Sequence, residues 1–126
     1  MVANTGGYVK QWLDEAKEDM DLARHALLLG NLRNAVFLAH LALEKTLKAL
    51  VFRSTSEPPP RIHNLSELAS RTDVLFDEKK MRFLAGMDFY QLAGRYPDAR
   101  RGGIDPERAM RDFHEAERIL EWLIKQ

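Results

Sequence analysis

The chain has 126 residues, with 19 Lys and Arg against 19 Asp and Glu, so its formal net charge is +0. This length suits one domain over residues 1–126, and the balanced charge argues against a protein drawn to nucleic acid by bulk charge. The absence of cysteine excludes a disulfide scaffold, a thiolate nucleophile and any zinc site built on Cys.

The first two predicted helices cover residues 8–29 and 32–53. In the first, apolar residues recur every three or four positions. The second contains AVFLAHLALEKTLKALVF, which is apolar on almost every side and must be covered most of the way round. A chain this short has few elements for that, so we expect a second copy to cover part of it, and a central helix of a monomeric bundle is the alternative. The candidate interface residues are Phe37, His40, Leu41 and Glu44.

A proline-rich break separates the second helix from a short third one. Three prolines in STSEPPPRI, residues 54–62, forbid helix and predict a linker within the domain. Asn64 followed by Glu67 is a variant of the capping box. We therefore expect a short helix that runs to about Arg71.

Two longer helices follow. Residues 77–93 predict the first of them, with Met81, Leu84, Ala85 and Leu92 on one apolar face and Phe83, Met87 and Tyr90 on another. Asp105-Pro106-Glu107 marks the start of the last helix with a cap, a proline and an early acid. The predicted class is all-α: an antiparallel up-and-down four-helix bundle with one short extra helix. The predicted buried stripe of the last helix is Ala109, Met110, Phe113, Ala116, Leu120 and Leu123.

Three stretches in this order resemble one family. WLDEAKEDMDLARHALLLGNLRNAVF is similar to an opening helix pair joined by a Gly turn, and FLAHLALEKTLKAL, residues 37–50, is similar to an A-x-x-A-x-E-K-x-x-K-A signature. His63-Asn64-Leu65 and Arg95-Tyr96-Pro97-Asp98 match H-x-L and R-Y-P-D segments. Over about residues 8–125 the chain therefore resembles the R-Y-P-D-containing branch of the HEPN (higher eukaryotes and prokaryotes nucleotide-binding) domain family.

The resemblance implies a homodimer of helical bundles that acts beside a minimal nucleotidyltransferase in a toxin–antitoxin-like pair. It also implies nucleotide binding, or in other branches a metal-independent ribonuclease with an R-x4–6-H motif. Two stretches match that motif, Arg33 to His40 and Arg108 to His114. Neither lies in the expected window, residues 82–98, which contains no histidine. Arg108 and His114, six positions apart, also point about 120° away from each other on a helix.

The candidate ligand residues lie in three places. Arg95, Tyr96 and Asp98 follow the fourth predicted helix, where Arg offers phosphate contacts and Tyr a stacking face. Lys45 and Lys48 on the second helix are candidates for a phosphate site, although an ion pair of Lys48 with Glu44 is favoured. His63 is a candidate base without an evident acid partner in the sequence. For each of the three places, a structural role is the favoured alternative: a helix end, an ion pair and an anchor for the proline-rich loop.

The leading hypothesis is a non-catalytic HEPN-type homodimer that binds a nucleotide, a nucleotidyltransferase partner or both. The alternatives are a metal-independent ribonuclease toxin and a structural adaptor, and a tetramer stays open. We expect no metal site and no cofactor. A nucleotide is the ligand to test, and RNA is less expected than a nucleotide as a partner. No apolar run reaches the roughly 18 residues of a membrane span, and MVANTGGYVK lacks a signal-peptide core. The expected location is the cytoplasm, without membrane contact.

Overall fold

A computed structural model describes residues 5–95 and 103–126, with the side chains of residues 6–92 and 103–126. This part of the chain is helical and contains no strand, which confirms the all-α class. The helices are α1 (Thr5–Leu28), α2 (Leu32–Thr55), α3 (Leu65–Ser70), α4 (Glu78–Arg95) and α5 (Pro106–Ile124).

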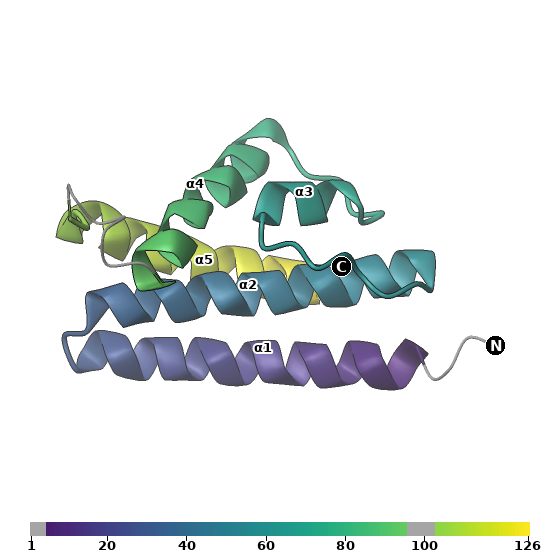
Figure 1. Ribbon diagram of the computed structural model, residues 1–126, viewed down its shortest axis with the longest axis horizontal. Coiled ribbons are helices and arrows are strands. Elements are labelled where there is room, and N and C mark those ends of the chain that lie inside the picture. The colour runs from purple at the N-terminus through teal and green to yellow at the C-terminus, as the bar shows by residue number, and fades with distance from the viewer. Residues whose placement is uncertain (1–4, 96–102) are drawn as a thin grey trace.

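The long helix α2 is the centre of the fold. Figure 1 shows α1 and α2 as an antiparallel hairpin, with α5 behind α2, α4 inclined across the top and α3 above the carboxyl-terminal half of α2. α2 packs against each of the other four helices. One chain thus covers most of the apolar surface of α2 by itself, so a second copy could meet only the part of α2 that stays exposed.

The turn between α1 and α2 follows from Gly30 and Asn31. Gly30 has a φ of +77°, which a residue with a Cβ adopts only under strain. The Asn31 N–H donates to the Ala26 carbonyl at 2.8 Å and the Gly30 N–H to the Leu27 carbonyl at 3.0 Å. This pair of bonds is a Schellman motif, which ends a helix and reverses the chain.

Side-chain caps fix the starts of α3 and α5, as the sequence predicts. The Asn64 side chain accepts a hydrogen bond from the Glu67 N–H at 2.9 Å. Asp105 caps α5 by accepting from the Glu107 N–H at 3.2 Å, and Pro106 occupies the first helical position. Caps of this kind are worth about 1 kcal/mol each.

The core lies around α2. Fully buried side chains from every helix meet there, and the pattern of α5 is as predicted except that Met110 is exposed. The two tryptophans pack at the margins, Trp12 edge-on to Phe52 and Trp122 edge-on to Phe76. The largest buried side chains include Phe113, Met20, Leu43, Leu47, Leu50, Leu65, Leu68, Leu84, Met87 and Leu123.

An ion pair joins α1 to α5. Arg24 Nε lies 2.6 Å from Glu117 Oε2, and His114 Nδ1 lies 3.1 Å from the other oxygen of the same carboxylate. Burial alone would raise the pKa of Glu117, but the hydrogen bonds from Arg24 and His114 outweigh it, so the pKa lies below its ordinary value.

Replacing Glu117 by Gln should therefore destabilise the protein in a pH-dependent manner. A lowered folded-state pKa contributes stability above the unfolded value of 4.5, and this contribution is lost as the pH falls through the folded-state value. We expect a loss of about 0.5–1 kcal/mol at neutral pH, because the pair is partly exposed. Urea unfolding at several pH values measures it, with Glu121→Gln on the same helix as the control. A difference between wild type and variant that stays constant into acid would contradict this prediction.

Candidate functional site

Five polar side chains from α2, α4 and the segment before α3 form one connected network. Four of them were predicted as site or interface residues, and the fifth, Asp88, was not. Hydrogen bonds and ion pairs join His40 to Asp88, and Glu44 to His63 and Lys48; the two groups meet where His40 Nδ1 lies 3.9 Å from Glu44 Oε1. The network lies where α2 meets α3 and α4. The members are His40, Glu44, Lys48, His63 and Asp88.

Asp88 is the link between α2, α3 and α4. His40 Nε2 lies 2.9 Å from Asp88 Oδ1, and the same oxygen accepts from the Leu65 N–H at 3.2 Å. His40 is only 1% exposed, so its ring N–H needs an internal acceptor. A carboxylate on α4 thus satisfies a buried histidine on α2 and the first turn of α3.

Glu44 gathers the other half of the network. His63 Nδ1 lies 3.1 Å from both carboxylate oxygens, and Lys48 Nζ lies 2.9 Å from Oε2. The Glu44 side chain is 7% exposed, whereas that of His63 is 47% exposed. A buried carboxylate therefore holds one ring nitrogen of a histidine that faces solvent, which is the loop anchor that the sequence favoured for His63.

Glu44 and His40 are covered by their own chain and are not surface residues. Of the four predicted interface residues, Phe37 and Leu41 are only half-buried and keep part of their surface outside. Spacings of four and seven place Phe37, Leu41 and Lys48 on one side of α2. Glu44, seven positions after Phe37, lies on this side too and is covered, so this side of α2 is only partly open.

Lys45 is engaged with α1 and not with the network. Its Nζ lies 2.8 Å from Asp19 Oδ2 and 3.2 Å from Glu15 Oε1. Burial would lower the pKa of Lys45, but the bonds to Asp19 and Glu15 outweigh burial and raise it. A lysine held in this way locks the α1–α2 hairpin. The sequence favoured a structural role for the charge group of Glu44, Lys45 and Lys48, but it did not predict these partners on α1.

A pocket of about 250 Å³ lies between the second half of α4 and the start of α5. At Gly86 the pocket is open, since a Cβ at this position would have no atom within 4 Å. Gly103 has a φ of +71°, which favours glycine just before the α5 cap. The lining residues are Gly86, Phe89, Tyr90, Gly103, Asp105 and Arg108.

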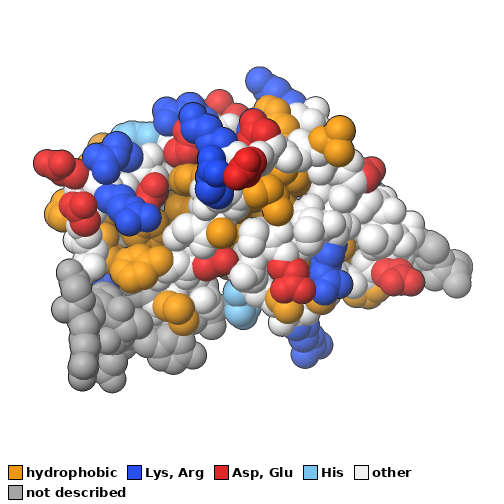
Figure 2. Space-filling model, turned by 90° about the horizontal axis from the view of Figure 1, so that it is seen from above, with side chains coloured by type: hydrophobic (Ala, Val, Ile, Leu, Met, Phe, Trp, Pro, Cys, Tyr) orange, Lys and Arg blue, Asp and Glu red, His pale blue; other side chains and the backbone are white. Residues whose placement is uncertain are grey.

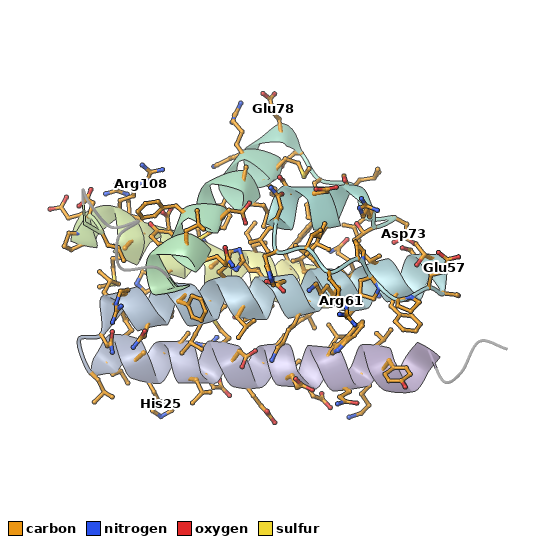
Figure 3. The ribbon with its side chains drawn as sticks, in the orientation of Figure 1. His25, Glu57, Arg61, Asp73, Glu78 and Arg108 are labelled. Carbon is orange, nitrogen blue, oxygen red and sulfur yellow. The ribbon has the colours of Figure 1, made fainter. Side chains whose placement is uncertain are left out.

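The polar groups of this pocket differ in how firmly they are held. The Tyr90 hydroxyl donates to Asp112 Oδ2 at 2.5 Å, and burial together with this bond raises the pKa of Tyr90 above its ordinary value. Tyr90 thus stays a neutral donor that pins α4 to α5. Arg108 lies 3.8 Å from the same carboxylate with a side chain 67% exposed, so its guanidinium can turn to a ligand. In Figure 3 Arg108 lies at the end of the molecule where α5 begins.

The R-Y-P-D segment begins where α4 ends. Arg95 is the last residue of α4, but its side chain, Tyr96 and Asp98 lie outside the described residues. The pocket, which includes Phe89 and Tyr90, lies within two helical turns of that end. Sequence reasoning missed Phe89 and Arg108.

The two R-x4–6-H matches do not form a site. His40 is buried and hydrogen-bonded to Asp88, and His114 pairs with Glu117 near the middle of α5, on a side of the helix turned away from Arg108. Among the described residues, no three His, Asp or Glu side chains are placed to hold a metal ion. The helices of that part also lack a segment apolar and long enough to cross a membrane.

The family model of the HEPN domain matches residues 9–126. This match covers nearly the whole chain and fits the helical architecture described above. The chain therefore belongs to the HEPN family. No curated protein and no solved structure is found to match it.

Proposed function

We propose that this HEPN chain is a non-catalytic homodimeric module that binds a nucleotide at the pocket between α4 and α5. A minimal nucleotidyltransferase is the expected protein partner, and the two would act as a two-component, toxin–antitoxin-like pair. The family match supports a role connected with nucleotides. The observation that carries the proposal is the position of Phe89 and Arg108 on opposite helices around one pocket.

The lining suits the two ends of a nucleotide. Phe89 is 44% exposed, and an aromatic face of this kind stacks on a nucleobase. Arg108 offers a fork of donors for phosphate oxygens. The volume of about 250 Å³ is smaller than that of sites for whole drug-sized ligands. One end of the nucleotide would fill the pocket while the other lies along the surface.

Replacing Arg108 by Ala should weaken nucleotide binding roughly tenfold or more, because a charge-assisted phosphate contact is worth about 1.5–3 kcal/mol. Phe89→Ala should weaken it by a similar factor through lost stacking. Calorimetric titration with ATP, GTP and AMP measures both effects. Arg118→Ala is the matched control, since Arg118 lies on the same helix with an equally exposed side chain. Absence of binding at millimolar nucleotide, or equal losses in the two arginine variants, would contradict this site.

The dimer has two apolar surfaces to use. Phe37 and Leu41 are half-buried on α2, and Leu92 is 48% exposed on α4. Figure 2 shows hydrophobic side chains on the face seen from above, between groups of Lys, Arg, Asp and Glu. Interfaces with an apolar centre and a charged rim have this character.

Sedimentation should give a dimer at micromolar concentration. A charge at a buried interface position is costly, so Leu92→Asp should weaken the dimer by roughly tenfold or more. Leu28→Asp is the control, because Leu28 is 84% exposed at the end of the α1–α2 hairpin and lies outside both surfaces. A wild-type monomer across the concentration range would contradict the proposed assembly.

A further inference from the structure

The solvent-facing ring of His63 is oriented as a reactive histidine would be, and not only as an anchor for the loop. Its Nδ1 lies 3.1 Å from both oxygens of the buried Glu44 carboxylate. Because that carboxylate can only accept, Nδ1 carries the ring proton. In the neutral ring the lone pair then resides on Nε2, on the side of a half-exposed ring away from Glu44.

The backbone on both sides of His63 is fixed. The Ile62 N–H donates to the Pro60 carbonyl at 2.9 Å before it. After it, the Asn64 side chain caps α3 and the Leu65 N–H donates to Asp88. The imidazole is therefore presented from a rigid support, which is what a reactive side chain needs.

Lys48 places a cation beside this imidazole. Its Nζ lies 2.9 Å from Glu44 Oε2, an oxygen that His63 also contacts. The Lys48 side chain is 20% exposed, and the shared contact with Glu44 Oε2 places its ammonium on the Nδ1 side of the ring. A histidine oriented by a carboxylate and flanked by a lysine is an oriented nucleophile next to a positive charge.

These features fit phosphoryl acceptance better than other nucleophilic reactions. Acyl transfer needs an oxyanion hole of preorganised donors, and the network supplies none among the described residues. Phosphoryl transfer needs an in-line approach and charge stabilisation more than covalent assistance. An open ring nitrogen and a neighbouring ammonium provide both.

We propose that His63 Nε2 accepts a phosphoryl group from a small acyl phosphate or phosphoramidate, with Glu44 as its positioning residue and Lys48 stabilising the transferred group. The Nε2 lone pair forms the new N–P bond while the bond from phosphorus to the leaving group breaks. The leaving group takes that electron pair, as a carboxylate or as ammonia. The positive charge on the ring is balanced by Glu44 through Nδ1–H, and no redox change occurs. This modification is independent of the pocket between α4 and α5.

The chain contains two comparator histidines. His114 also pairs through Nδ1 with a carboxylate, but with one oxygen and on the exposed surface of α5. His25 Nδ1 contacts only the Asp21 carbonyl, and Figure 3 shows His25 on the outer side of α1. Exposure alone would make these two at least as reactive as His63.

The test is incubation of the full chain with potassium phosphoramidate, followed by peptide mass spectrometry at alkaline pH. We expect His63 to be labelled roughly tenfold or more faster than His114 and His25, the scale on which an oriented base acts. His63→Asn should remove this fast phase. Equal labelling of the three histidines, or an unchanged fast phase in His63→Asn, would overturn the proposal.

The role of Glu44 has its own readout. Glu44→Gln should slow labelling of His63 roughly tenfold, the size of effect expected for a supporting carboxylate, and leave His114 unchanged. Nitrogen NMR of the His63 ring should show the proton on Nδ1 in the wild type and a changed tautomer in the variant. An unaltered tautomer with unaltered labelling would overturn the positioning role. If Glu44→Gln does not fold, two measurements still test the proposal. One is the labelling rate of His63 in Lys48→Met, and the other is the ratio of His63 to His114 labelling in the wild type.

Discussion

Replacing Asp88 by Ala should destabilise the protein by about 3 kcal/mol, because two buried donors lose their shared acceptor. The donors are the ring N–H of His40, which is 1% exposed, and the Leu65 N–H at the start of α3. Both donors belong to buried residues, whereas the Asp88 side chain is 26% exposed. A domain of this size has a total stability of about 5–15 kcal/mol, so the variant should unfold at a clearly lower urea concentration.

Asp88→Asn is the matched variant. Its amide oxygen can take the place of Oδ1 and accept both bonds, but as a neutral acceptor, so the loss should be about 1 kcal/mol. A double-mutant cycle of Asp88→Ala with His40→Leu should give a coupling of about 1 kcal/mol or more. Equal losses for Asp88→Ala and Asp88→Asn would mean that the bonds to His40 and Leu65 do not hold α2, α3 and α4 together.

Phe113→Ala should cost about 3–5 kcal/mol, the usual range for removing a buried aromatic ring. Phe113 is the largest of the fully buried side chains and lies on the side of α5 that faces the core. The cavity would form beside α2. Because α2 is packed against four other helices, it cannot shift to fill the cavity.

Met110→Ala is the control for Phe113→Ala. Met110 is also a large apolar residue of α5, three positions away, but it is 39% exposed. Its truncation removes little buried surface, so the loss should stay below about 1 kcal/mol. Thermal or urea unfolding compares the two variants. Similar losses would contradict the packing of α5 described here.

The helix boundaries were largely predictable, because caps and breakers act locally. Gly30, the three prolines and the Asp105-Pro106 start all lie where the structure changes direction. The neighbours of α2 were not predictable. Its pattern shows that nearly every side is apolar, but not whether the same chain or a second copy covers it. The inclined α4 and the short α3 supply that cover.

Periodicity also left the buried face of α4 undecided. The sequence offers two apolar faces, and the structure buries Leu84, Met87 and Tyr90 while Ala85 and Leu92 stay exposed. Two stripes of similar hydrophobicity cannot be ranked without their neighbours. The same reason explains Met110, which the α5 pattern placed inside.

Contacts between segments far apart in the sequence were the hardest part of the site to predict. His63 lacked an acid partner in the sequence, because Glu44 lies on another element and reaches it only in the fold. Asp88 carried one available signal: it is a charged residue between Met87 and Phe89 in an apolar stretch. A charge that is buried even in part needs a partner, but the partner itself could not be identified from the spacing.

The most direct test of the account is amide NMR of the full chain during titration with ATP, GTP and AMP. Nucleotide binding between α4 and α5 predicts shifts that cluster at Gly86, Phe89, Gly103 and Arg108. Gly30, in the α1–α2 turn, should not move. Shifts that saturate at the pocket would support the proposed site. Shifts confined to the surroundings of His63 and Lys48, or none at millimolar nucleotide, would contradict it.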